Sequence, residues 1–292
     1  DGSRRAVGDK IRIFYSQGGH LYIAADDPLC RPGRLLGEAE AVVKNSDVVI
    51  LCVGLDERME GEQGDEGNAF ASGDKENLLL PETQQILIER VIALGKPVVL
   101  VINSGSALDL SAYEHKVSAI IQAWYSGERG GEALANILFG KTNPSGKLPV
   151  TFYYNGQPMP EFTEYHMANR TYRFVEAAPW YPFGYGLTYS RFHYENFSAA
   201  AVEGGIDVRV EVENGSSRGG DEIVEFYVRY EGDAFEKPHH KLVGFKRGNV
   251  PGHEIAEFHY HIPEKALMSV MENGKSVLLD GAYTLFAGGC QP

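Results

Sequence analysis

The sequence predicts two domains, an α/β domain with a mostly parallel sheet flanked by helices and then an all-β sandwich. In the first half, short β-branched runs alternate with amphipathic helical patterns, which is typical of a parallel sheet covered by helices. Beyond residue 190, segments alternate apolar and polar residues, which favours antiparallel strands with one solvated face. We expect an α/β domain over residues 1–152, an inter-domain strap over 153–190 and the sandwich over 191–292.

The candidate strands of the first domain are short runs rich in Val and Ile, and helical patterns separate most of them. The run at residues 47–53 is apolar almost throughout, which predicts a fully buried central strand with Cys52 as a buried core thiol. Pro81 fits the first turn of a helix, where its missing N–H costs nothing. The expected order is strand 10–15, helix 34–44, strand 47–53, helix 81–94, strand 97–102, strand 118–124 and helix 131–139.

The second domain reads as an immunoglobulin-like sandwich, because turn residues separate its period-two segments. His239 and His240 lie between two of these segments and are expected to be exposed loop residues. They do not indicate a metal site, since no third ligand stands at a suitable spacing. The candidate strands are residues 206–214, 222–230, 242–247, 255–262 and 283–287.

Composition narrows the possible partners. The formal charge is −13, from 40 acidic and 27 basic side chains, and a surface of that sign repels nucleic acid and anionic membranes. Neutral substrates such as sugars are compatible with it. Three cysteines are too few for a disulfide framework or a zinc site, and no run reaches the roughly 18 apolar residues of a membrane helix. We therefore expect a soluble chain, cytoplasmic or secreted, with no metal and no cofactor.

An acidic loop follows the predicted strand at residues 47–53. Residues 55–65 contain five carboxylates in eleven positions. Ligand sites of open parallel sheets lie beyond the carboxyl ends of the strands, so this is where chemistry is expected. Crowded like charges and partial burial raise carboxyl pKa values, as a general acid requires. The alternative interpretation is a solvated acidic loop or a cation site.

Several motifs occur in one order along the chain. Residues 53–81 contain VGLD, EGE, GDK and LLLP; residues 123–131 read AWYSGERGG, 143–152 read NPSGKLPVTF and 182–189 read PFGYGLTY. Together they resemble the carboxyl-terminal α/β sandwich of family 3 glycoside hydrolases. Residues 219–222, 242–247 and 286–289 resemble the fibronectin-type-III-like domain that ends many members. The resemblance covers essentially the whole chain.

The resemblance implies roles for individual residues. The acid/base of the family is a loop glutamate, and its position matches Glu62, with Glu60 as runner-up because the spacing to the following Asp varies. Asp74 and Lys75 are expected to support the loop rather than to touch substrate. This loop departs from the family pattern by an insertion at residues 64–72, and Lys75 stands where many members have Arg.

The substrate-binding residues expected from this chain are Asn103 and Trp124, which follow or end predicted strands. An aromatic ring at such a place can stack on a sugar or shape the loop. The family's nucleophile is an Asp on a separate barrel domain, and no eightfold βα series is present here. The family's first sheet strand is missing as well. We therefore expect a partner polypeptide that carries the barrel, the nucleophile and this strand.

The resulting hypothesis is a glycoside hydrolase that is incomplete without its barrel domain. It is part of a retaining exo-acting β-glycosidase, foremost a β-glucosidase, acting on a β-glycoside. β-Xylosidase is the alternative, because the residues that hold the terminal sugar belong mostly to the barrel. A second alternative is a non-catalytic subunit that binds carbohydrate or holds an assembly together, which the missing nucleophile favours.

Overall fold

The computed structural model describes residues 8, 11–22, 33–61, 75, 77–161, 163–234 and 237–292. The chain forms two compact units. The first comprises Asp1–Phe139 with Tyr153–Gln157, and the second comprises Gly140–Phe152 with Pro158–Pro292. Glu62 and Asp74 lie outside the described residues.

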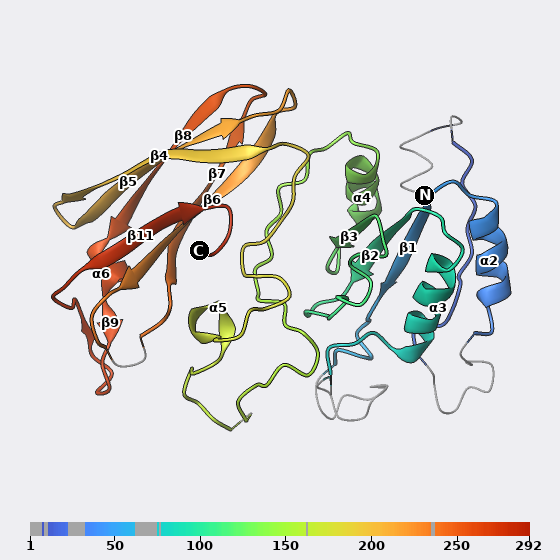
Figure 1. Cartoon of the computed structure of the whole chain (residues 1–292), viewed down its shortest axis with the longest axis horizontal. Helices are drawn as coiled ribbons and strands as arrows, with labels where there is room; N and C mark the ends of the chain where they lie inside the picture. The colour runs from blue at the N-terminus through green and yellow to red at the C-terminus, as the bar shows by residue number, and fades with distance from the viewer. Residues whose placement is uncertain are drawn as a thin grey trace. The chain divides into compact units, whose positions relative to one another are not determined.

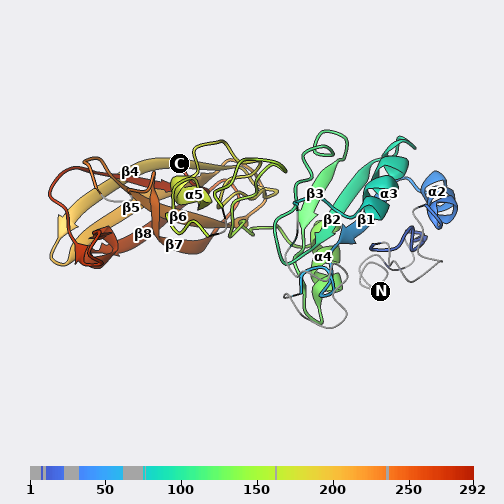
Figure 2. The same ribbon diagram turned by 90° about the horizontal axis from the view of Figure 1, so that it is seen from below.

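The first unit contains a parallel sheet in the order β1-β2-β3 (Figure 1). Helices α3 and α4 lie on opposite faces of this sheet (Figure 2), and α2 packs beside α3. This arrangement confirms the predicted α/β architecture. The elements are α2 (Leu36–Lys44), β1 (Val49–Gly54), α3 (Glu82–Ile92), β2 (Val98–Asn103), β3 (Ala119–Gln122) and α4 (Gly130–Leu138).

One face of the sheet supplies much of the core of this unit. Leu51 pairs with Leu100 and Val53 with Ile102, and all four side chains are buried. Paired residues of parallel strands point to the same face, so these side chains form one continuous apolar layer. Each such burial contributes about 1.5–3 kcal/mol.

Two expectations for the first unit are wrong. Residues 11–15 form no strand, and the side chains of Phe14 and Tyr15 are exposed. The strand predicted to be fully buried is β1, which lies at the edge of the described sheet with Ile50 and Cys52 exposed. The reason is that the described residues cover only one face of β1, so its apolar run is buried on alternate positions.

The second unit is an antiparallel sandwich of two three-stranded sheets, in the orders β4-β5-β8 and β11-β6-β7. Its core consists of Val, Phe and Ile side chains from both sheets, among them Val210, Phe226 and Phe258. Every predicted strand is present, and β4, β9 and β10 are additional. The elements are α5 (Thr171–Phe174), β4 (Phe192–Val202), β5 (Gly205–Asn214), β6 (Gly220–Tyr230), β7 (Lys241–Val250), β8 (Ile255–Pro263), α6 (Glu264–Leu267), β9 (Ser269–Val270), β10 (Ser276–Val277) and β11 (Tyr283–Gly288).

A buried ion pair fastens the segment Gly140–Phe152 to the sandwich. Lys147 Nζ donates to Glu222 Oε1 at 3.1 Å, and Tyr194 Oη donates to the same oxygen at 2.7 Å. Only 4% of the Glu222 side chain is exposed. Removing one partner of such a pair leaves an uncompensated buried charge, which costs about 3–5 kcal/mol. The lysine of the NPSGKLPVTF motif thus has a structural role.

His240 is buried, contrary to the expectation of an exposed loop residue. Its side chain packs against Tyr172 and Tyr227, and the residue is 8% exposed. Burial, with smaller effects from His239 and Arg229, lowers the pKa of His240 to about 4. The predicted exposure was wrong because the aromatic residues that cover His240 come from distant parts of the sequence.

Stability should therefore depend on the ionisation of His240. The folded-state pKa lies below the unfolded value of about 6.5, so the unfolded state binds more protons as the pH falls. Between pH 7 and pH 4.5 the second unit should lose about 2–3 kcal/mol through this residue alone. Chemical denaturation at both pH values should show this difference shrinking in His240→Phe. An unchanged pH dependence in His240→Phe would refute the assignment.

Candidate active site

The carboxyl ends of β1 and β2 approach each other unusually closely. Gly54 has φ 145°, and a Cβ at this position would lie 1.9 Å from the Asn103 carbonyl oxygen. The next amide, that of Leu55, donates to the same oxygen at 2.7 Å. Only glycine fits this contact, because any other side chain would clash with backbone. The contact fixes the direction in which the chain leaves β1.

Gln84 of α3 holds the end of β1 from the other side. Its Oε1 accepts from the Gly54 amide at 2.7 Å, and its Nε2 donates to the Gly54 carbonyl at 2.7 Å. The Gln84 residue is 3% exposed. Buried backbone groups need such partners, since an unpaired one costs about 1–3 kcal/mol. The side chain of one glutamine therefore completes the hydrogen bonding of the strand end.

A compact turn carries the chain from β1 to Glu60. The Asp56 carbonyl accepts from the amides of Met59 and Glu60 at 3.0 and 3.1 Å, and Asp56 Oδ1 accepts from the Arg58 amide at 3.1 Å. Met59 is fully buried, so its side chain anchors the turn. The acidic loop therefore begins as ordered structure.

The Glu60 carboxylate contacts both neighbouring loops of the sheet edge. Its Oε2 accepts from the Gly105 amide at 2.7 Å and from the Tyr125 hydroxyl, while its Oε1 accepts from the Ser106 hydroxyl. Gly105 and Ser106 follow β2, and Tyr125 follows β3. Both oxygens of Glu60 are thus occupied as hydrogen-bond acceptors.

These contacts set the ionisation of the group. Partial burial raises the pKa of Glu60, but hydrogen bonds from Ser106, Tyr125 and Gly105 and the charge of Lys75 together hold it below its ordinary value. Burial, and then the carboxylate of Glu60, raise the pKa of Tyr125. Glu60 is therefore a carboxylate at neutral pH, and Tyr125 is its neutral donor.

The chain is anchored again where it returns toward α3. Lys75 Nζ donates to the Ala107 carbonyl at 2.9 Å, so this side chain contacts the loop after β2. Burial lowers the pKa of Lys75, and the nearby Glu60 partly offsets that effect. Further along, the Leu78 amide donates to Asn155 Oδ1 at 3.0 Å. Both flanks of the segment that contains Glu62 are thus tied to the first unit.

The two expected substrate-binding residues lie at the same edge. Asn103 is the last residue of β2 and is partly exposed. Trp124 follows β3 with φ 55°, a left-handed conformation that a residue with a side chain rarely adopts. Strained backbone of this kind is concentrated at functional sites. Here it sets the direction in which the chain continues after Trp124. The sequence did not predict Tyr125 and Ser106 as partners of Glu60, although their positions beyond strand ends were a signal.

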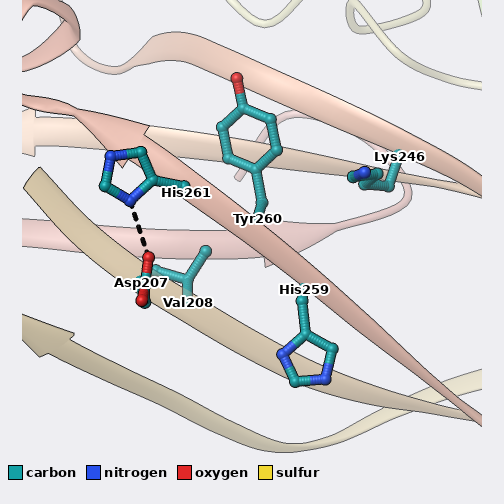
Figure 3. A pocket seen from close by; sticks show the side chains of 6 residues that line it. All are labelled: Asp207, Val208, Lys246, His259, Tyr260 and His261. Carbon is teal, nitrogen blue, oxygen red and sulfur yellow. Dashed lines mark hydrogen bonds and ion pairs between the residues drawn. The ribbon is translucent and has the colours of Figure 1, made fainter.

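The second unit has a separate hollow of about 450 Å³ lined by residues of β5, β7 and β8, shown in Figure 3. His261 Nδ1 lies 2.7 Å from Asp207 Oδ1, whereas His259 points away from this pair and contacts Glu257 at 2.6 Å. The two histidines are thus paired separately rather than converging on one point. Among the described residues no cluster of three or more His, Cys, Asp or Glu side chains could hold a metal ion.

The fold and the site define a class of protein, an α/β domain with an acidic strand-end site followed by an antiparallel sandwich. Residues 5–189 match the Glycosyl hydrolase family 3 C-terminal domain, and residues 222–291 match the fibronectin type III-like domain. The chain therefore belongs to glycoside hydrolase family 3. No described helix is long and apolar enough to cross a membrane.

The relatives of this chain include proteins named as β-xylosidases and proteins named as β-glucosidases. A xylan 1,4-beta-xylosidase of Xylanibacter ruminicola is 37% identical over 79% of this chain and 27% of its own length. A periplasmic beta-glucosidase of Salmonella typhimurium is 29% identical over 98% of this chain and 40% of its own. The solved structure of a b-glucosidase from Erythrobacter marinus has a TM-score of 0.86 at 29% identity, covering 99% of this chain and 41% of that one. This chain spans less than half the length of these proteins.

The Gln84 bridge predicts a stability effect. Gln84→Ala leaves the buried N–H and C=O of Gly54 without partners, so the free energy of unfolding of the first unit should fall by about 2–3 kcal/mol. Glu89→Ala, at an exposed position of the same helix, should change it by less than about 0.5 kcal/mol. Urea denaturation followed by circular dichroism measures both. Equal effects of the two substitutions would contradict the bridge.

Proposed function

We propose that this chain supplies the general acid/base to a retaining exo-acting β-glycosidase, foremost a β-glucosidase, and that Glu62 is that residue. The observation that carries the proposal is the fixed position of Glu60, two residues before Glu62, at the carboxyl edge of the family's parallel sheet. Sites of open parallel sheets lie at this edge. Similarity to proteins named beta-glucosidase and beta-xylosidase supports the substrate class.

The environment of Glu60 favours Glu62 over it as the acid. A general acid must hold a proton near neutral pH and present it to the leaving oxygen. The lowered pKa of Glu60 and its three hydrogen-bond donors leave it ionised and engaged with protein groups. A residue so occupied is poorly suited to protonate substrate. The second glutamate of the EGE motif is the remaining candidate.

The mechanism follows from the two-carboxylate chemistry of retaining glycosidases. A nucleophilic carboxylate attacks the anomeric carbon, and an acid about 5–5.5 Å away from it protonates the departing oxygen. The same acid, now deprotonated, then activates the water that hydrolyses the glycosyl-enzyme. In this proposal Glu62 performs both proton transfers, and an Asp of a barrel domain outside this chain is the nucleophile. Asn103 and Trp124 contact the substrate from the sheet edge.

The exposed face of β1 supports a partner polypeptide. Ile50 of β1 is 38% exposed and Val48, which directly precedes β1, is 56% exposed; β1 pairs with only one strand among the described residues. An apolar strand with a free edge is a site where another strand can add. The relatives are more than twice as long as this chain. We therefore propose that the barrel-bearing polypeptide also contributes the strand beside β1.

β-Xylosidase is the second candidate, and the similarity to a xylan 1,4-beta-xylosidase at 37% identity favours it. A non-catalytic subunit that binds carbohydrate or holds an assembly together is the third, because this chain carries no proposed nucleophile. Native mass spectrometry distinguishes an enzyme subunit from a non-catalytic subunit. A fixed one-to-one ratio of this chain to a barrel-sized chain supports the enzyme, whereas a lone chain that binds saccharide supports the non-catalytic subunit.

The catalytic assignment is tested in the assembly of this chain with its barrel polypeptide. Glu62→Ala should lower kcat/KM for aryl β-glycosides with poor leaving groups by about 10²–10⁴-fold, because protonation of the leaving oxygen is lost. Substrates with good leaving groups should still glycosylate the enzyme, and azide should restore turnover. If Glu62→Ala behaves like the unmodified enzyme while Glu60→Ala shows this pattern, the acid is Glu60. Comparing glucosides with xylosides decides the sugar.

A further inference from the structure

One carboxylate joins all three strand-end loops of the first unit. Glu60 lies on the loop after β1, accepts from the backbone amide of Gly105 and the hydroxyl of Ser106 after β2, and accepts from Tyr125 after β3. The three donors come from positions 45, 46 and 65 residues away in sequence. Contacts of such separation restrict loops that are otherwise independent.

The surrounding backbone is shaped to permit these contacts. A Cβ at position 105 would lie 3.0 Å from the Tyr125 ring and 3.2 Å from Glu60 Oε2, so glycine allows both groups to approach the backbone. The left-handed conformation of Trp124, φ 55°, lies directly before Tyr125. Strained backbone of this kind persists only where surrounding contacts enforce it. The Glu60–Tyr125 hydrogen bond is one such contact.

The position of Glu60 matters to any group that follows it closely in the chain. Two residues of fully extended chain span at most about 7 Å, so a proton donor two residues after Glu60 depends on where Glu60 is held. On the far flank, Lys75 binds the Ala107 carbonyl of the loop that also holds Glu60. Glu60 and Lys75, which stand on the two sides of residues 62–74 in the sequence, thus both bind the loop after β2.

We propose that Glu60 is a positioning residue, an ionised clamp that sets the location of the acid/base glutamate by tying the β1 loop to Gly105, Ser106 and Tyr125. This inference rests on the proposed function, because the residue that it positions is Glu62. Positioning is worth much in catalysis: a displacement of about 1 Å can cost about 100-fold in rate.

The kinetic test uses graded substitutions in the assembled enzyme. With a poorly activated aryl β-glycoside, Glu60→Ala should lower kcat/KM by about 100-fold and Glu60→Gln by about 10-fold, because glutamine retains one neutral acceptor. Glu57→Gln removes the same charge from an exposed position of the same loop and should have little effect. Azide should not restore activity to either Glu60 variant, since the Glu62 carboxylate is still present and repels the anion.

The partner hydroxyl provides an independent test. Tyr125→Phe removes one donor and should lower kcat/KM several-fold, and combining it with Glu60→Gln should cost less than the product of the single effects, because both remove the same contact. Tyr165→Phe is the matched control, since Tyr165 is 88% exposed. Additive effects of Tyr125→Phe and Glu60→Gln would show that the two side chains do not act through one another.

Hydrogen exchange tests the clamp without catalysis, on this chain alone. The Gly105 amide donates to Glu60, so its exchange should quicken by about 10-fold or more in Glu60→Ala and less in Glu60→Gln. It should not change in Glu57→Gln. Unchanged exchange in Glu60→Ala would overturn the clamp even if activity falls. Should Glu60→Ala fail to fold, Glu60→Gln and Tyr125→Phe carry the test.

The outcomes separate this inference from the function on which it rests. If Glu62→Ala shows the acid/base pattern while both Glu60 variants match Glu57→Gln, only the positioning role is wrong. If azide rescues Glu60→Ala, Glu60 is itself the acid and the positioning role is overturned. If Glu62→Ala keeps full activity and azide does not rescue Glu60→Ala, the proposed catalytic function fails.

Discussion

The parallel pairing of β1, β2 and β3 is the constraint on which the site depends. In a parallel sheet the loops that follow the strands emerge at one edge, so segments far apart in sequence become neighbours. Here the register is fixed at its end by Gly54, whose backbone approaches the Asn103 carbonyl so closely that no side chain fits. A larger residue would separate the strand ends. It would thereby displace the β1 loop from the donors that hold Glu60.

The motifs typical of the family contribute to two different parts of the structure. The EGE sequence contributes Glu60 to the strand-end cluster, whereas Lys147 of NPSGKLPVTF pairs with Glu222 inside the second unit. A buried ion pair adds little net stability over an apolar pair, but it strongly penalises any arrangement that separates its charges. Lys147 therefore specifies one docking of the segment Gly140–Phe152 on the sandwich. A strongly recognisable motif can thus be structural rather than catalytic.

The sequence predicted element types better than it predicted exposure. Alternation and apolar runs report local structure, so the three parallel strands and every strand of the two sandwich sheets except β4 were found. These patterns do not report which faces of a strand are covered by other parts of the chain. Cys52 is exposed because only one face of β1 is packed among the described residues, and His240 is buried because Tyr172 and Tyr227 reach it from elsewhere in the chain. Residues 11–15 had a strand-like composition but no partner strand among the described residues.

In the candidate site, too, the sequence pattern did not report the contacts that individual side chains make. The resemblance to the family ranked Glu62 above Glu60 but gave no physical reason for the ranking. The reason comes from Tyr125, Ser106 and Gly105, whose hydrogen bonds keep Glu60 ionised. Two glutamates separated by one glycine can therefore serve opposite needs. In the proposed reaction Glu60, which accepts from three donors, holds the loop, and Glu62 carries the proton. The contacts that support this proposed division of roles are tertiary, and the linear pattern does not contain them.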